Sequence, residues 1–532
     1  MILIYMKKIL LLSIVLLVVT SCVSTKSYNE NITSLHTVED LHKDVDKVYK
    51  QLKKHHPKLY QYTSKSVLDF KFDSLKSSIT KPINSREFYK KLAPVVTNVR
   101  QGHVGVSSAN KRFTKKERKI IVKKKFAFND LDFEYLHDKL WVVNTRGKDS
   151  TLLGNEVVKV NDELVVNLVD IFKTQFASDG YNTTLHNRYV GKNFKTFYSR
   201  NRGFVDSLKV TFKNQDSVFI KTFKRIKKEV NKKKIDSFKK VNKELSKAEK
   251  KAKKLAFKKK RKYRKKHGYS YSRKHYTRNL NFVGKDSIVA LMKIRGFSNG
   301  PYKEFYIESF AKLDSAKTKH FILDLRDNGG GRISEIDYLY SFLADKDYQF
   351  ITESEVNSRL PFFKYLMSNT SPVGLKIVSG ILSPFIAAHN LLKIKKRDGK
   401  LYYNFKKHSK IKSPNPLNFN GKMYVLINGN SFSASSIIST HLKANKRATF
   451  VGEETGGSYN GTVAGIYKVY QLPTSKLKIR IGLMQIETPQ RQNPDGFGVK
   501  ADIEINPNIA DRKANIDTEL EWILNDIENS KD

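Results

Sequence analysis

The stretch FILDLRDNGGG, residues 321–331, decides the fold of this 532-residue chain. Its apolar start, 321–323, is typical of a buried strand, and the polar turn that follows ends in three successive glycines. Glycine has no side chain, so such a turn can present backbone N–H groups without obstruction. The G-x-x-x-x-G-K-[ST] spacing of a phosphate loop is missing. The turn therefore fits an oxyanion hole, where fixed dipoles meet a developing negative charge, or a plain tight turn.

Strands and helices alternate around this stretch, which predicts an α/β core over residues 281–532. A separate segment, 350–400, interrupts the alternation and is apolar, with Pro384 inside it. We interpret it as a lid-like insertion over a cleft; ordinary core is the alternative. The closing stretch 517–527 has apolar residues on one side and predicts an amphipathic helix. The core strands are expected at residues 288–292, 320–325, 423–427 and 449–451.

Two further domains are predicted before this core. Residues 23–115 read as helical, with apolar residues at three- and four-residue spacing until the pair His56-Pro57 ends a long helix. Residues 120–223 read as short strands and turns, including two strands around an Asn-Asp turn within 153–164. This layout resembles a PDZ module, which would capture peptides by strand addition. The alternative is a small β-domain with only a structural part.

Nearly half of the net charge of +49 is concentrated in one segment. Between Lys221 and Arg278 there are 27 Lys and Arg against four acidic residues, so we treat 224–280 as a basic insertion. Such a segment could contact phosphate-bearing polymers or anionic lipid head groups. The alternative, which the usual solvation of charge runs favours, is a helical insertion that remains soluble through self-repulsion.

The first 22 residues have the pattern of a secretory signal peptide. Lys7 and Lys8 precede an apolar run over 9–19, and small residues then lead to Cys22. This order resembles a bacterial lipobox, so residues 1–22 are expected to be a lipoprotein signal peptide with Cys22 as the lipidated residue. Cys22 is the single cysteine, which excludes an internal disulfide and a cysteine-based zinc site. The expected location is the cell envelope, on a bacterial membrane and facing the periplasm or the exterior.

A second motif, NSFSASSII at 430–438, follows the predicted strand 423–427. A strand that ends in a polar turn and opens a helix places Ser433 near a helix N-terminus, where unpaired N–H groups favour negative charge. Serine is also a preferred helix-capping residue, so any of the four serines here could serve only as a cap.

A third motif, QGHV at 101–104, places His103 behind a flexible glycine. An isolated histidine is usually structural, and this chain has 13 of them. His441 is excluded as a base for Ser433, because eight residues of helix separate the two by ~12 Å.

Together these motifs resemble the C-terminal-processing (tail-specific) serine peptidase family. The D-x-R-x-N-x-G-G motif of that family matches 324–331, S-A-S-E matches 433–436, V-G-E-x-T-x-G matches 451–457, and D-G-H-T matches 101–104. The resemblance implies a ClpP/crotonase-like peptidase core with a helical N-terminal domain and a PDZ-like β-domain. It also implies that Ser433 is the nucleophile of a serine endopeptidase.

The departures from the family pattern select a branch. Where the Ser-Lys branch carries its base, this chain has Ser458, so it resembles the branch that uses Ser, His and an acid. His103 is then the base, and Asp495 is the best match for the acid, with Glu487 as second choice. The oxyanion donors would be the backbone N–H groups of Gly330 and Ala434. No metal or other cofactor is expected.

The resemblance implies cleavage of envelope proteins or peptides near their C-termini through an acyl-enzyme. Two other functions remain open. The chain could be a catalytically idle peptidase fold that binds apolar peptides or ligands, which the substitutions around His103 and the apolar segment 350–400 would fit. It could instead be a polyanion- or lipid-surface-binding lipoprotein that acts through the basic insertion. Nucleic acid is not an expected partner, because the signal directs the chain out of the cytoplasm.

Overall fold

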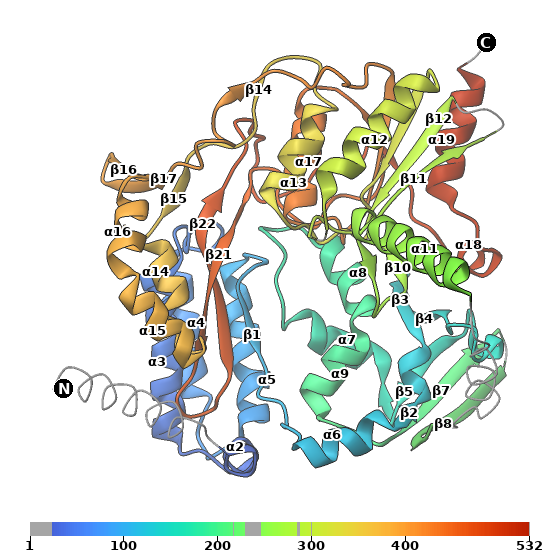
Figure 1. The fold of residues 1–532 in the computed structure, drawn as a ribbon. Helices are drawn as coiled ribbons and strands as arrows, with labels where there is room; N and C mark the ends of the chain where they lie inside the picture. The colour runs from blue at the N-terminus through green and yellow to red at the C-terminus, as the bar shows by residue number, and fades with distance from the viewer. Residues whose placement is uncertain (1–23, 216, 229–245, 285–287, 299, 531–532) are drawn as a thin grey trace.

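The computed structural model describes residues 24–215, 217–228, 246–284, 288–298 and 300–530 (Figure 1). The predicted signal peptide and Cys22 lie outside these residues. The described chain forms an α/β core, a helical N-terminal part and a separate β-domain. The α/β fold class with a helical N-terminal region is confirmed. Among the described helices, none combines the length and the apolar character needed to cross a membrane.

The core is a six-stranded sheet in the order β11-β12-β13-β19-β20-β23. The strands from β12 to β23 are parallel, and β11 is antiparallel at the edge. Parallel neighbours need crossover connections, so helices cover both faces of the sheet. The strands are β11 (Arg278–Val283), β12 (Val289–Ile294), β13 (His320–Asp324), β19 (Lys422–Ile427), β20 (Thr449–Gly452) and β23 (Ile503–Glu504).

Successive side chains of these strands pack into two hydrophobic cores, one on each face of the sheet. Phe321 and Leu323 of β13 pack on the side of α12, α13 and α17, whereas Ile322 points into the cluster that contains Ile523 of α19. The two-residue period of a strand is the reason, because successive side chains leave opposite faces. The helices are α12 (Tyr302–Ser315), α13 (Ile333–Ser341), α17 (Ala434–Ala444), α18 (Ile509–Ala514) and α19 (Thr518–Asn529). All four predicted core strands and the C-terminal helix are present within a few residues of their expected ends.

The N-terminal helices pack around a long hairpin from the end of the chain. The hairpin is β21 (Thr462–Gln471) and β22 (Lys478–Ile486), and its tip residues Leu472 and Leu477 are buried against these helices. Strand β1 (Gly105–Ser107) pairs antiparallel with β22, so the predicted site segment 101–104 joins the C-terminal half of the chain. The N-terminal elements are α2 (Thr25–Thr33), α3 (Val38–His55), α4 (Lys65–Ser77), α5 (Ser85–Val96) and η1 (Thr97–Val99).

The β-domain has its own hydrophobic core between a sheet and three helices. The predicted turn is present: Asn161 and Asp162 both have positive φ and connect β5 to β6, as a tight hairpin requires. The PDZ-like character of this domain stays a prediction. Its elements are α6 (Lys115–Val122), β2 (Lys124–Phe126), η2 (Ala127–Asp130), β3 (Asp132–Leu136), β4 (Lys139–Asn144), η3 (Ser150–Leu152), β5 (Glu156–Val160), β6 (Glu163–Leu164), α7 (Val165–Lys173), α8 (Thr184–Lys192), α9 (Phe194–Arg202), β7 (Ser207–Asn214) and β8 (Ser217–Lys227).

The described part of the basic insertion is a helix, α11 (Lys247–Lys266), with a hairpin of β9 (Tyr269–Ser270) and β10 (His275–Tyr276). No side chain of α11 is buried. Its C-terminal end is attached to the core, where the ring of Tyr263 stacks on His267 and Lys266 pairs with Glu308 of α12. The helical form matches the solvated-insertion interpretation.

The segment predicted as a lid forms a small helical unit at the side of the molecule. Figure 1 shows α14, α15 and α16 at the left edge, beyond β21 and β22. Whether this unit acts as a lid stays a prediction. The elements of the segment and its surroundings are β14 (Tyr348–Gln349), β15 (Ser354–Val356), α14 (Pro361–Leu366), α15 (Val373–Ile381), α16 (Ser383–Leu391), β16 (Ile394–Arg397), β17 (Lys400–Tyr403) and β18 (Ile411–Lys412). Pro384 lies in the first turn of α16, where its missing N–H costs nothing.

Candidate active site

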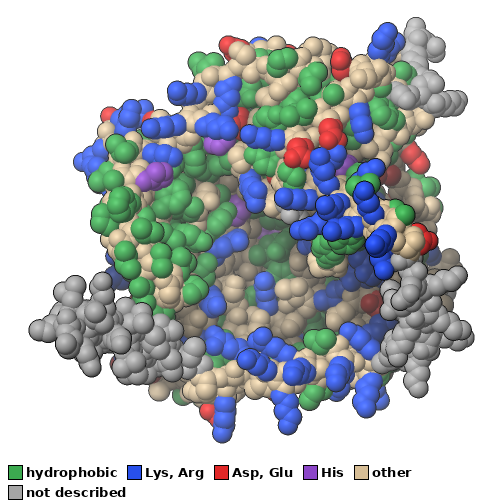
Figure 2. Space-filling view, in the orientation of Figure 1, with side chains coloured by type: hydrophobic (Ala, Val, Ile, Leu, Met, Phe, Trp, Pro, Cys, Tyr) green, Lys and Arg blue, Asp and Glu red, His purple; other side chains and the backbone are tan. Residues whose placement is uncertain are grey.

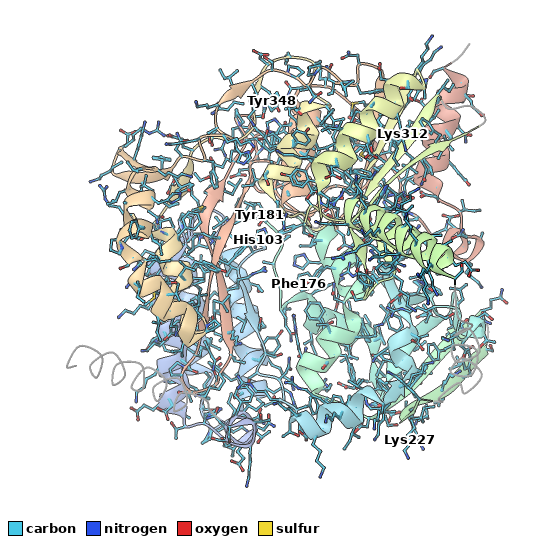
Figure 3. All side chains as sticks on the ribbon, in the orientation of Figure 1. His103, Phe176, Tyr181, Lys227, Lys312 and Tyr348 are labelled. Carbon is cyan, nitrogen blue, oxygen red and sulfur yellow. The ribbon has the colours of Figure 1, made fainter. Side chains whose placement is uncertain are left out.

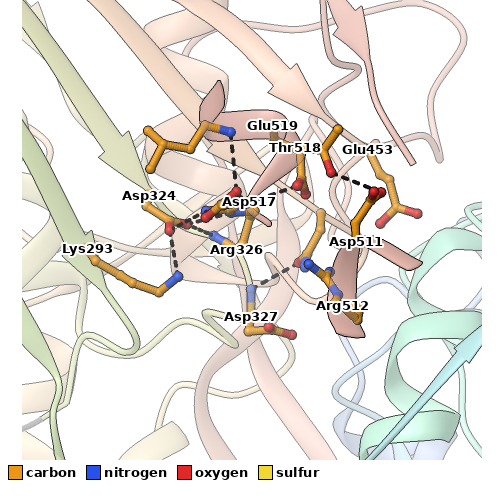
Figure 4. A network of polar contacts seen from close by, with 12 residues as sticks. Lys293, Asp324, Arg326, Asp327, Glu453, Asp511, Arg512, Asp517, Thr518 and Glu519 are labelled. Atoms are coloured by element: carbon orange, nitrogen blue, oxygen red, sulfur yellow. Dashed lines mark hydrogen bonds and ion pairs between the residues drawn. The ribbon is translucent and has the colours of Figure 1, made fainter. Parts of the chain in front are cut away.

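The polar residues of the glycine-rich turn hold it in place. Asp324, at the end of β13, is buried and accepts from both Lys293, at 2.6 Å, and Arg326, at 2.8 Å (Figure 4). Arg326 reaches on to Asp517, the cap of α19, at 2.6 Å. These cations hold the pKa of Asp324 well below its usual range, against the opposing effect of burial. The network ties the turn to the C-terminal helix.

Ser433 lies at a sharp turn between β19 and α17. Its backbone has φ 57° and ψ −116°, a conformation that L-residues rarely adopt and that costs of order 1–3 kcal/mol. A nucleophile on such a strained strand-to-helix turn has its hydroxyl exposed above the sheet. Although Ser433 stands at the cap position of α17, its side chain caps no backbone N–H.

The other three serines of the motif are buried and have structural partners. Ser431 donates to the carbonyl of Leu325 at 2.8 Å, and Ser435 donates to that of Asn328 at 2.8 Å. Ser436 donates to the carbonyl of Ser431 at 3.3 Å. The hydroxyls of Ser431 and Ser435 therefore join the serine turn to the glycine-rich turn. Of the four serines, Ser433 is the one left partly exposed.

His103 is brought to Ser433 from 330 residues away in the sequence. Its Nε2 lies 3.0 Å from the Ser433 hydroxyl oxygen, within hydrogen-bond distance. Figure 3 shows His103 near the centre of the molecule. The pairing of β1 with β22 fixes the histidine loop, and Arg480 of β22 donates to the His103 carbonyl at 2.9 Å. The ring also packs at 5.0 Å from that of Phe432, the residue before Ser433.

Burial keeps the His103 ring neutral. Desolvation, with a smaller contribution from the charge of Arg480, lowers the pKa of His103 to about 3. A neutral imidazole can accept a proton at Nε2 when Nδ1 carries the hydrogen. Nδ1 lies 3.3 Å from the hydroxyl of Tyr467 in β21, which can accept that hydrogen. Burial also raises the pKa of Tyr467 to about 12, so the phenol remains protonated.

The predicted acid does not contact the base. The Asp495 carboxylate accepts from Gln61 at 2.9 Å and from Asn460 at 3.0 Å, and it holds the loop around Ser458 to the N-terminal domain. The second choice, Glu487, pairs with Arg491 and accepts from Gln485. Among the described residues, no carboxylate is hydrogen-bonded to His103. The contact expected between His103 and Asp495 is therefore not made, because Tyr467 occupies the place beside Nδ1.

The two predicted oxyanion donors differ in their surroundings. Ala434 is the first residue of α17, where helix N–H groups lack intrahelical partners. The N–H of Gly330, in contrast, already donates to the side chain of Asn328 at 2.9 Å. Gly330 matters sterically: a Cβ there would lie 2.8 Å from the Ala434 nitrogen and 2.9 Å from the Ser433 Cβ. Its lack of a side chain keeps the space before the Ala434 N–H open.

Two residues of this region were not singled out from the sequence. Tyr467 is one of 26 tyrosines, and nothing in its neighbourhood marks it. Asp179 lies in a Ser-Asp-Gly stretch that reads as a turn, yet its buried carboxylate accepts from the Gly102 N–H at 2.8 Å. Burial raises the pKa of Asp179 to about 6. Both residues act on the histidine loop through the tertiary structure, so no local signal could have found them.

The described residues contain no group of three or more His, Cys, Asp or Glu side chains arranged to hold a metal ion.

Residues 288–505 match the model of peptidase family S41. Over these residues the chain is similar to the S41 peptidases. It is a serine peptidase, a hydrolase that acts on peptides or proteins. The recognition of the C-terminal-processing peptidases in the sequence is confirmed. The matched segment contains the glycine-rich turn and Ser433, whereas His103 lies outside it.

The solved structures of mature CPAF share the fold of this chain. Mature CPAF complexed with lactacystin is 15 % identical, covers 90 % of this chain and 95 % of its own, and has a TM-score of 0.58. Mature CPAF alone is 14 % identical over 90 % and 94 % of the two chains, with a TM-score of 0.56. The photosystem II D1 C-terminal processing protease is 12 % identical over 88 % and 94 %, with a TM-score of 0.41. No curated protein matches the sequence.

Proposed function

We propose that Ser433 is the nucleophile and His103 the general base of an endopeptidase that works through an acyl-enzyme. The observation that carries this proposal is the 3.0 Å contact between the Ser433 hydroxyl and Nε2 of a neutral His103. A nucleophile within hydrogen-bond reach of its base is the geometry that such catalysis needs. The strained backbone of Ser433 supports the same role, since strain of this kind persists where the surrounding structure enforces it.

The chemistry follows from these atoms. As the Ser433 oxygen attacks the scissile carbonyl carbon, its proton moves to Nε2 of His103. The carbonyl oxygen becomes an oxyanion, which the Ala434 N–H and the N-terminus of α17 would stabilise. The C–N bond then breaks and the amine leaves with the proton from Nε2. A water molecule, deprotonated by the same nitrogen, releases the acyl group and restores the serine.

Tyr467 takes the position that an acid would have in this arrangement. By accepting the hydrogen on Nδ1, its hydroxyl would select the tautomer that leaves Nε2 free to act as a base. Tyr467 is therefore a positioning residue, and it provides no counter-charge for the protonated ring. Asp495 and Glu487 would affect the site through the loops that they hold.

The proposed substrates are proteins or peptides of the cell envelope, cut near their C-termini. The lipobox-like sequence before Cys22 supports a lipid anchor and an extracytoplasmic location. Helix α11 supports additional contacts with anionic surfaces, because it has 13 Lys and Arg against one Glu and no buried side chain. Of these cations, Lys266 has a carboxylate partner in the structure.

The test is the reaction of the purified chain with a serine-directed fluorophosphonate, followed by peptide mapping. Labelling at Ser433, and its loss together with peptide cleavage in Ser433→Ala, would support the proposal. Ser436→Ala is the matched control, since it removes a neighbouring hydroxyl that donates to the Ser431 carbonyl. Cleavage retained by Ser433→Ala would refute the assignment. A folded parent chain that never reacts would instead indicate an idle peptidase fold that binds peptides.

A further inference from the structure

A group of large apolar side chains on α15, α16 and the residue that follows is exposed to solvent. We call these residues the apolar patch: Leu375, Val378, Ile381, Leu382, Phe385 and Leu392. Ile381, Phe385 and Leu392 are 72 %, 74 % and 79 % exposed, which is extreme for such residues. Figure 2 shows a broad green area on the left side, over the helices that Figure 1 labels α14 to α16. Soluble monomers rarely expose a contiguous apolar area of this kind without a partner.

In α15 and α16 the buried residues are polar and many of the exposed residues are apolar, which is the reverse of the usual pattern at a surface in water. The one buried residue of α15 is Ser379, and that of α16 is Asn390, which donates to the carbonyl of Ile386 at 2.5 Å. Polar side chains thus face the protein while isoleucine, leucine and phenylalanine face outward. Removal of apolar area from water is favourable, so an apolar cover over the outer face would stabilise this arrangement.

The charge of the segment indicates what covers it. Residues 357–397 contain seven Lys and Arg and no Asp or Glu, and one of these cations, Arg397, pairs with Glu353 outside this range. A surface that combines apolar side chains with lysine and arginine, and lacks acidic groups, is typical of helices that lie in the interface of an anionic membrane. Each helix has nine residues and is ~13 Å long, far short of the ~30 Å bilayer core. The helices could lie in the interface but could not cross it.

The patch also belongs to the same packed unit as the start of the described chain. Ser368 and Thr370, after α14, donate to the carbonyl of Val469 in β21, and the β21–β22 tip packs on the N-terminal helices. Asn357 donates to the carbonyl of His56 at 2.7 Å, which joins the segment directly to the end of α3. The described chain begins at Ser24, two residues after Cys22.

We infer that the apolar patch docks on a lipid bilayer, with its side chains in the acyl-chain boundary and its cations at anionic head groups. A contact of this kind would add a second attachment to the lipid anchor proposed at Cys22. The inference goes beyond the peptidase activity and depends on neither Ser433 nor His103.

The test uses the chain from residue 23 onward, which retains every described element and lacks the apolar leader and Cys22. Phe385→Trp places a reporter in the patch, and the fluorescence of the parent chain, with its two tryptophans, is subtracted. Vesicles of phosphatidylcholine with phosphatidylglycerol, carrying brominated acyl chains, should quench the reporter and shift its emission to shorter wavelength. Phe257→Trp is the matched control, since Phe257 is 66 % exposed on α11, where only head-group contact is expected.

The affinity is measured by vesicle sedimentation with the combined variant Ile381→Ser, Phe385→Ser and Leu392→Ser. Because these side chains are exposed, the variant should melt like the parent and keep its reaction with the fluorophosphonate. Each substitution should weaken vesicle binding roughly tenfold, from the apolar area that insertion removes from water. Unchanged vesicle binding by the combined variant, or equal quenching of the Phe257→Trp and Phe385→Trp reporters, would overturn the inference. A parent dimer that the combined variant turns into a monomer, without vesicle binding, would assign the patch to a second copy of the chain instead.

Discussion

Replacement of Tyr467 by phenylalanine would remove the hydroxyl beside Nδ1 of His103 and almost nothing else. The ring would still pack at 5.4 Å from the imidazole and under the guanidinium of Arg480, so the site should keep its shape. The lost group is the hydrogen-bond partner that holds the ring in the tautomer needed for catalysis.

The size of the effect follows from the burial of the site. A buried N–H group without a hydrogen-bond acceptor costs about 1–3 kcal/mol, because it cannot donate to water instead. His103 is 9 % exposed, so its Nδ1 has little access to solvent after the substitution. If this cost destabilises the tautomer that carries the hydrogen on Nδ1, the rate of acylation drops by roughly 10- to 100-fold.

The assay is hydrolysis of a fluorogenic peptide ester, with kcat and KM determined separately. Tyr467→Phe should lower kcat and leave KM and the melting temperature nearly unchanged. A merely structural role would move the melting temperature as well. Asp495→Asn is the comparison, and it should cost only a few-fold, since Asp495 contacts Gln61 and Asn460 and leaves His103 alone.

The opposite pattern would refute this reasoning. Removal of a carboxylate that orients a catalytic histidine costs about 10⁴-fold in kcat. A loss of that size in Asp495→Asn, together with full activity in Tyr467→Phe, would mean that substrate binding moves Asp495 to His103.

Further outcomes are expected from burial and strain. Because the pKa of His103 is about 3, kcat/KM measured in short assays should stay near its neutral value down to about pH 5; a midpoint between pH 6 and 7 would contradict this. His55 and His56 also have pKa values lowered to about 3, so the unfolded chain, with pKa near 6.5, binds more protons below that pH. The unfolding free energy in denaturant titrations should therefore be largest above pH 6.5 and fall by about 2 kcal/mol per buried histidine at pH 5. Ser433→Gly should unfold with a free energy about 1 kcal/mol higher than Ser433→Ala, because glycine adopts φ 57° without strain; equal values would argue against a strained turn. Gly330→Ala should abolish phosphonate labelling and lower the melting temperature, since its Cβ would meet the Phe432 carbonyl at 2.7 Å; an active, stable variant would be inconsistent with this crowding.

Local patterns in the sequence were sufficient for much of the fold. Apolar runs before polar turns located β13 and β19, and the Asn161-Asp162 pair located the β5–β6 turn, because strand periodicity and turn chemistry act over a few neighbouring residues. The order of several motifs singled out Ser433 and His103 as a candidate pair. Their 3.0 Å contact then required the structure, since β1 must pair with β22 to bring them together.

The partners of that pair were decided by tertiary structure alone. The resemblance to the family pattern suggested Asp495 as the acid, but the β21–β22 hairpin places Tyr467 beside His103 and leaves Asp495 in a loop contact. The apolar segment 350–400 was likewise readable as a lid or as core, because apolar content does not say which way a side chain points. Only the packing of α14 to α16 turns Ser379 and Asn390 inward and exposes the apolar patch. Sequence patterns report local preference, whereas contacts across hundreds of residues depend on how whole elements pack.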